Sequence, residues 1–443
     1  MSQYKTAKLD RDQIDHAIQT ELHDISKDSK DGEVFNRFRE DTKKYTLDVK
    51  VLERMKASSS TEQYGAVYNI NSKMDYIIYL YEKFNLPTMK VDDEYKDEIE
   101  IAWTHHLIHH MTVGAYLSID DENQLTIDSN WLDINSQYFI DHISKNYYGT
   151  AGIVPDLENF STILHGQPIA ITIPFEFSNN LVHSLPLYNL SNTIQFKFEF
   201  QLKVCKLLRM RKLIGGIWTN IEIDPKYLSK TDALTEVPKP EIFARYALQN
   251  KKIRDYYYDS DDKREIYLLD VVTVTSVNDI DFGKSIEIDL QCPNPCRGVF
   301  VTAQNITARD QNYYANYTTN ANDHTLGSNP IELFSISYGS IERVKLDNLD
   351  VAMLTLNDMP NDPLDVGYTA YSNAFNIMST EHDTSIIYLQ NNARIKLKIR
   401  DRKKDEPNTK FDVKIKLLVV KPFDHDHKAN TFNARDWYSD HTF

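Results

Sequence analysis

Four histidines within six residues form the strongest candidate for metal chemistry in this sequence. In the run WTHHLIHHM at residues 103–111, His105 and His109 are four residues apart, and so are His106 and His110. On a helix this spacing would place each pair on one face, as a zinc site requires. Alternating apolar residues on both sides instead predict a strand, which would separate His105 from His109 by roughly 14 Å. We therefore expect no metal ligands here.

The remaining reactive residues also lack the spacing that metal binding or catalysis would need. Only Cys205, Cys292 and Cys296 are present, too few for a disulfide framework, and Cys292-Pro-Asn-Pro-Cys296 reads as a stiff turn. The acidic run 259–265 has neither the glycine nor the terminal glutamate of a calcium loop. Phosphate-binding and nucleophile-elbow motifs are absent from the sequence. We predict no catalytic, cofactor-binding or metal-binding residues, and no enzyme.

Charge argues against a protein that coats nucleic acid. The formal net charge is −15, whereas nucleic-acid binding calls for a basic surface. Two segments, 202–213 and 394–421, are nevertheless rich in lysine and arginine, and acidic residues gather at 92–100 and 259–262. These segments are either solvated faces or complementary patches that steer one subunit against another. We predict no sequence-specific nucleic-acid binding.

Apolar residues alternate with polar ones in both halves of the chain, which indicates strands with one buried face. The longest example runs from Ile194 to Val204, and shorter ones occupy 286–290, 395–399 and 413–417. Such strands with few helical windows predict antiparallel sandwiches. Helical spacing at 14–25 predicts an N-terminal helix, and 131–143 fits a short inserted helix.

The chain is long enough for two sandwich domains. It has 443 residues, and prolines flank a polar stretch between 224 and 240 that fits neither strand pattern. We predict an N-terminal helix and arm at 1–40, a first domain at 41–225, a second at 240–422 and a tail at 423–443.

One segment resembles a motif of a known family. After the strand 168–173 come Pro174-Phe175-Glu-Phe177, a Leu185-Pro-Leu turn and the alternating strand from Ile194. This order is similar to that in the double-jelly-roll major capsid proteins of nucleocytoplasmic large DNA viruses and related smaller double-stranded DNA viruses. Further landmarks follow the family's order over about residues 45–420, namely Trp131-Leu-Asp-Ile134, Pro293-Asn-Pro295 with 298–301, and 367–372.

The resemblance implies an all-β fold of two tandem eight-stranded antiparallel jelly rolls, with an N-terminal helix or arm and a few short inserted helices. It also implies a virion protein, made and assembled in the host cytoplasm, whose homotrimers form pseudo-hexameric capsomers that tile an icosahedral shell. Partners would be neighbouring capsomers and, through the N-terminal helix, minor capsid proteins or membrane-associated proteins at the shell base. The resemblance implies no cofactor.

Two alternatives remain open at this point. A minor or penton capsid protein, or an assembly scaffold, would share the fold but occur in far fewer copies per particle. A jelly-roll lectin or cupin-type enzyme would bind glycan, or would carry stoichiometric metal at residues 105–110.

Overall fold

The computed structural model describes residues 47–423, apart from 61–64, 71–73, 120–121, 141–148, 154, 179–183, 188–192, 230–235, 250–265, 291, 293, 340, 373, 375, 379–392 and 405. Three segments named above lie outside the described residues: the helix and arm predicted at 1–40, the acidic run at 259–265 and the tail beyond 423.

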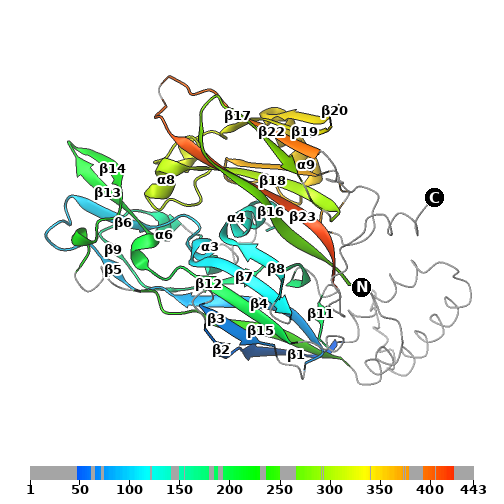
Figure 1. Cartoon of the computed structure of the whole chain (residues 1–443). Coiled ribbons are helices and arrows are strands. Elements are labelled where there is room, and N and C mark those ends of the chain that lie inside the picture. Colours follow the sequence, from blue (N-terminus) through cyan, green and yellow to red (C-terminus); the bar gives the residue numbers. More distant parts are fainter. Residues whose placement is uncertain are drawn as a thin grey trace, which may run out of the picture.

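The first half of the chain forms an antiparallel jelly roll (Figure 1). One sheet has the order β1 (Leu47–Arg54), β15 (Glu241–Gln249), β4 (Tyr76–Asn85) and β10 (Pro168–Ile173), with β11 (Leu185–Pro186) also on β4. The facing sheet has the order β2 (Ala57–Ser59), β3 (Ala66–Asn69), β12 (Ile194–Phe200), β7 (Thr112–Ile119) and β8 (Glu122–Asp128). Smaller sheets contain β14 (Ile217–Ile221), β13 (Leu208–Ile214) and β6 (Ile99–Trp103), and the pair β5 (Met89–Lys90) and β9 (Ile163–Leu164).

The second half forms another jelly roll, made of two four-stranded antiparallel sheets. One has the order β16 (Ile266–Asp281), β23 (Lys410–Phe423), β18 (Cys296–Asn305) and β21 (Tyr368–Ser372). The other has the order β17 (Ser285–Leu290), β22 (Ala393–Ile399), β19 (Ile331–Tyr338) and β20 (Ile341–Asp347). The prediction of an all-β protein with two tandem jelly rolls is confirmed.

Helices are short and lie in the connections between strands. They are α3 (Leu107–Met111), α4 (Ser129–Tyr138), α6 (Pro155–Glu158), α8 (Ile306–Asp310) and α9 (Asn348–Asp358). Single turns of 3-10 helix are η1 (Glu176–Ser178), η3 (Val204–Lys206), η4 (Pro225–Tyr227) and η5 (His324–Leu326). None of the helices in the described part of the chain is long and apolar enough to span a membrane.

Alternation predicted the strands well, because each buries one face. In β22, Ile395 and Leu397 are fully buried while Lys396 between them is exposed. The longest predicted strand is shorter than expected: β12 ends at Phe200, where its pairing with β7 shifts register, and Val204 begins the turn η3. A bulge of this kind ends regular pairing without any change in the apolar spacing.

Strand β15 belongs to the first jelly roll, although the sequence analysis assigned residues from 240 onward to the second. It pairs with β1 from Leu47 to Arg54 and with β4 from Tyr76 to Lys83. We infer that the division between the jelly rolls lies beyond Gln249. The prolines before β15 therefore mark a loop within the first jelly roll.

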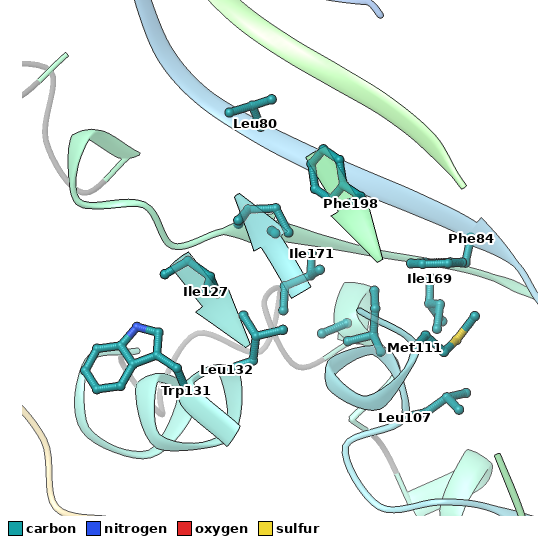
Figure 2. Close-up of a cluster of buried hydrophobic side chains, with 14 of the residues drawn as sticks. Leu80, Phe84, Leu107, Met111, Ile127, Trp131, Leu132, Ile169, Ile171 and Phe198 are labelled. Carbon is teal, nitrogen blue, oxygen red and sulfur yellow. The ribbon is translucent and has the colours of Figure 1, made fainter. Parts of the chain in front are cut away.

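The Pro-Phe-x-Phe segment of the sequence motif closes the core of the first jelly roll. Phe175 and Phe177 are buried and stack 5.4 Å apart, and Phe175 lies 5.7 Å from Phe196 of β12. Figure 2 shows the continuation of this core, where Leu107 and Met111 of α3 and Trp131 and Leu132 of α4 join strand residues such as Phe84, Ile169 and Phe198. Both helices therefore have an apolar face anchored in the first jelly roll.

Side chains of the charged segments form ion pairs within the chain. Strands β6 and β13 are neighbours, so the Arg211 Nε donates to Glu100 Oε2 at 2.7 Å. In the second jelly roll, Arg394 contacts Glu287 at 3.0 Å in the same way. For these residues, ion pairs between adjacent strands of one chain take up part of the charge, and the hypothesis of complementary patches between subunits stays a prediction.

Candidate functional site

A junction of buried polar residues joins the two jelly rolls. Helix α4 is buried along its length, including Asn130 and Asp133, because it lies between the sandwiches (Figure 1). Asn130 Nδ2 donates to Thr302 Oγ1 at 3.1 Å and Tyr317 Oη donates to Asp133 Oδ2 at 2.7 Å, both across the junction. Buried polar groups need partners of this kind, and here each jelly roll supplies the other's.

Aromatic rings and a buried asparagine complete the contact. Phe300 of β18 lies 5.3 Å from Trp131 and 5.7 Å from Tyr138, both on α4. Asn312, in a left-handed conformation with φ of 59°, donates through Nδ2 to the carbonyl oxygens of Cys205 and Leu208 at 2.9 and 2.8 Å. These directional contacts fix how the second jelly roll sits on the first.

The expectation of a strand through the histidine run is wrong. Strand β6 ends at Trp103, His106 adopts a left-handed conformation (φ 52°, ψ 46°), and α3 follows from Leu107. Leu107, Ile108 and Met111 are buried on the core side of this helical turn. Their spacing fits a helix, whereas a strand would have turned adjacent residues to opposite faces.

The helical turn brings the histidines to Asp133, which is fully buried. Its Oδ1 lies 2.8 Å from His109 Nδ1 and 3.1 Å from His106 Nδ1, and its Oδ2 lies 3.4 Å from His110 Nε2. Burial opposes ionisation of Asp133, but the charge of His110 and hydrogen bonds from His106 and His109 outweigh it and hold the pKa of Asp133 well below its usual value. For His109, burial dominates and lowers the pKa to about 4.

A second carboxylate, Asp365 from the second jelly roll, faces the same histidines. His105 Nε2 lies 3.4 Å from Asp365 Oδ2, and His105 Nδ1 lies 2.7 Å from Glu158 Oε2. Burial alone would lower the pKa of His105, but Glu158 and Asp365 together raise it to about 10. His324 also contacts Asp365, through Nε2 at 3.4 Å from Oδ1.

Half of this cluster can be recognised in the sequence, and the other half cannot. The histidine run was visible, but Asp133, Glu158, His324 and Asp365 are scattered over 133–365. Folding of the first jelly roll brings Asp133 and Glu158 to the histidines, and the packing of the second jelly roll on it adds His324 and Asp365. The sole signal in the sequence was the absence of apolar alternation inside the run itself.

The cysteines behave as buried thiols. Cys296 is fully buried and its Sγ donates to the carbonyl of Gly298 at 3.2 Å, while Cys292 Sγ donates to the carbonyl of Asn294 at 3.4 Å. Burial raises the pKa of both. Cys205 lies in the first jelly roll, in η3.

Comparison with known proteins agrees with the fold and the sequence motif. Residues 36–246 match the family model described as the major capsid protein N-terminus. None of the curated proteins compared with the chain matches its sequence.

Solved viral structures share the fold over both halves. PBCV-1 VP54, fitted into a reconstruction of the virophage Sputnik, has a TM-score of 0.65 at 12% identity, covering 85% of this chain and 94% of its own. The Faustovirus major capsid protein has a TM-score of 0.64 at 6% identity, covering 84% and 90%. The Sputnik virophage structure has a TM-score of 0.53 at 7% identity, covering 88% and 91%. The family model thus matches the first half of the chain, and both halves share the fold of solved double-jelly-roll capsid proteins, in agreement with the resemblance of the sequence motif.

Proposed function

We propose that three copies of this capsid protein form a pseudo-hexameric capsomer that tiles the icosahedral shell of a double-stranded DNA virus. The observation that carries the proposal is the junction: α4 and the loops around Asn312 hold two jelly rolls as one unit. Three such units around a threefold axis present six similar lobes, which suits sixfold positions of a lattice.

Exposed apolar side chains offer contact surfaces for neighbouring copies. On the hairpin β13–β14, which projects from the first jelly roll (Figure 1), Ile217 is 71% exposed and Ile214 is 54% exposed. On α9 of the second jelly roll, Leu349 is 72% exposed. Apolar side chains gathered on projecting elements are typical of protein contacts.

The proposal extends to what the subunit does in the particle. We infer a structural protein without catalysis, assembled in the host cytoplasm. The N-terminal segment outside the described residues would contact minor capsid or membrane-associated proteins at the shell base. With a net charge of −15, the subunit would not hold the genome by a basic lining.

Light scattering and negative-stain imaging of the purified full chain test the trimer. We expect a mass three times 51.5 kDa and blocks of hexagonal outline. Ile217→Asp should lower the trimer fraction while the monomer keeps its melting temperature, and Ile217→Val should keep the trimer because it stays apolar. A monodisperse monomer at high concentration would refute the proposal. A particle with about sixty copies, as five subunits at each of twelve vertices require, would favour a penton role.

A further inference from the structure

Three histidine side chains point the same nitrogen atom at one carboxylate, and they come from both jelly rolls. The Nε2 atoms of His105 and His106 lie 3.4 and 3.5 Å from Asp365 Oδ2. The Nε2 of His324 lies 3.4 Å from Asp365 Oδ1. His105 and His106 belong to the first jelly roll, and His324 and Asp365 belong to loops of the second.

These distances are those between ligands of one metal ion. A good hydrogen bond to nitrogen spans about 2.7–3.2 Å, so contacts of 3.4–3.5 Å are long for that role. Zinc holds nitrogen and oxygen ligands at about 2.0–2.1 Å in a tetrahedron, which places the ligand atoms about 3.3–3.4 Å apart. One ligand atom from each of His105, His106 and Asp365 lies within 4.8 Å of the other two, so these three side chains can share an ion, and His324 faces the other oxygen of the same carboxylate.

The opposite nitrogen of each ring is already occupied. His105 Nδ1 contacts Glu158 Oε2 at 2.7 Å, His106 Nδ1 contacts Asp133 Oδ1 at 3.1 Å, and His324 Nδ1 contacts the hydroxyl of Tyr313. Metal-bound histidines typically anchor their second nitrogen to a carboxylate or another polar group, which fixes the ring and its tautomer.

Asp365 is anchored in a similar way. Gln137 Nε2 donates to Asp365 Oδ2 at 2.9 Å, and the backbone amide of Asp365 donates to Gln137 Oε1 at 3.0 Å. The carboxylate is thus held in place by α4 of the first jelly roll while it faces the three imidazoles.

The backbone is bent to make this convergence possible. Side chains of adjacent residues normally diverge, yet the rings of His105 and His106 stack with centroids 4.1 Å apart. The left-handed conformation of His106, at φ 52°, allows this. Residues other than glycine are uncommon in that conformation, although histidine adopts it more readily than most, and such residues gather at functional sites.

Charge also favours a bound cation. Three carboxylates, Asp133, Glu158 and Asp365, lie 3.1, 2.7 and 3.4 Å from ring nitrogens of the histidines. A divalent ion would offset part of their negative charge.

We propose that His105, His106, His324 and Asp365 bind one zinc-type divalent cation that joins the two jelly rolls. Three imidazoles and one carboxylate are a donor set that zinc favours, and four protein ligands leave no position open for a substrate. The ion has a structural role: it links the two jelly rolls, each of which provides two ligands. The prediction of no metal ligands depended on a strand through residues 105–110, and the structure has a helical turn from Leu107 instead.

Metal analysis of the untagged full chain tests the proposal directly. After incubation with ZnCl2 and dialysis, we expect roughly one zinc per chain, as a closed four-ligand site requires. His324→Ala and Asp365→Asn should each lose most of that zinc. The matched control is His165→Ala, since His165 is exposed and lies outside the cluster, and it should keep the zinc. Zinc retained in both cluster variants, or absent from the unmodified chain, would overturn the proposal.

A spectroscopic measurement keeps the test decisive if a variant fails to fold. The unmodified chain, stripped with a chelator and loaded with Co²⁺, should show the intense visible absorption of tetrahedral cobalt, and ZnCl2 should bleach it. Chelator should also lower the melting temperature of the unmodified chain and of His165→Ala. The absence of a tetrahedral spectrum, together with a melting temperature that chelator leaves unchanged, would overturn the proposal.

Discussion

Glu82 should make the stability of the first jelly roll depend on pH. This residue lies in β4 with none of its surface exposed, and Thr112 Oγ1 donates a hydrogen bond to its Oε1. Its other oxygen has no hydrogen-bond partner among the described residues. Burial therefore disfavours the carboxylate and raises the pKa of Glu82 from 4.5 to about 8, despite the bond from Thr112.

The sign and size of the effect follow from linkage. Because the folded chain keeps the proton up to about pH 8 while the unfolded chain loses it near 4.5, the free energy of unfolding falls as pH rises between these values. Each pH unit in this range lowers the free energy of unfolding by about 1.4 kcal/mol. The total decrease is about 3 kcal/mol at neutral pH and about 5 kcal/mol above pH 8. Below about pH 4.5 this contribution to stability is fully present.

Glu82→Gln isolates the effect, because the amide is neutral at every pH and can still accept the bond from Thr112. We expect the free energy of urea unfolding of the variant to lose the part of the pH dependence that Glu82 contributes between about pH 5 and about pH 8, with a gain of about 2–3 kcal/mol at neutral pH. Glu122→Gln is the matched control, since Glu122 is exposed, and should behave as the unmodified chain. If Glu82→Gln and the unmodified chain show the same pH dependence, Glu82 is not protonated in the fold.

Three further predictions concern the contacts that hold the fold. Asn312→Ala should lower the free energy of unfolding by about 2–4 kcal/mol, because two buried carbonyls lose their donor and the left-handed backbone becomes strained. Asn312→Gly is free of that strain and should lower the melting temperature less in the same thermal melts. Phe300→Ala should lower the free energy of unfolding by about 3–5 kcal/mol, because it removes the ring that packs on Trp131. An unchanged melting temperature would show that the junction does not unfold together with the jelly rolls. Arg211→Glu should lower the free energy of unfolding by at most about 1 kcal/mol, and adding Glu100→Arg should restore it. If the second substitution restores trimer yield while the melting temperature never changes, the pair acts between subunits and not within one chain.

The strands could be predicted because their signal is local. Alternation in β22 and β23 depends only on neighbouring residues, and the buried faces of Ile395 and Val413 follow from it directly. The partner of a strand is a different matter. β15 alternates buried and half-buried residues from Glu241 to Tyr246, much as β4 does, and this pattern does not indicate that β1 and β4 are its partners.

The cluster at the junction could not be predicted for a related reason. The helical turn at Leu107–Met111 is only five residues long and begins after a left-handed residue, so its pattern is too short to outweigh the strands on either side. Asp365 lies 260 residues from His105, and only the docking of two completed sandwiches creates their contact.

The polar character of the junction has a structural consequence for a shell subunit. Apolar burial is non-directional, so two sandwiches held by it alone could slide or rotate against each other at little cost. Hydrogen bonds such as Tyr317 to Asp133, and the ion pair of the buried Lys416 with the half-buried Asp128 at 2.7 Å, are satisfied in one relative orientation only. In the proposed trimer, an angular error between the two lobes of one chain would be repeated three times around the axis, and the capsomer would depart from a hexagonal outline. Directional contacts across the junction therefore suit a subunit whose two lobes must act as one rigid tile.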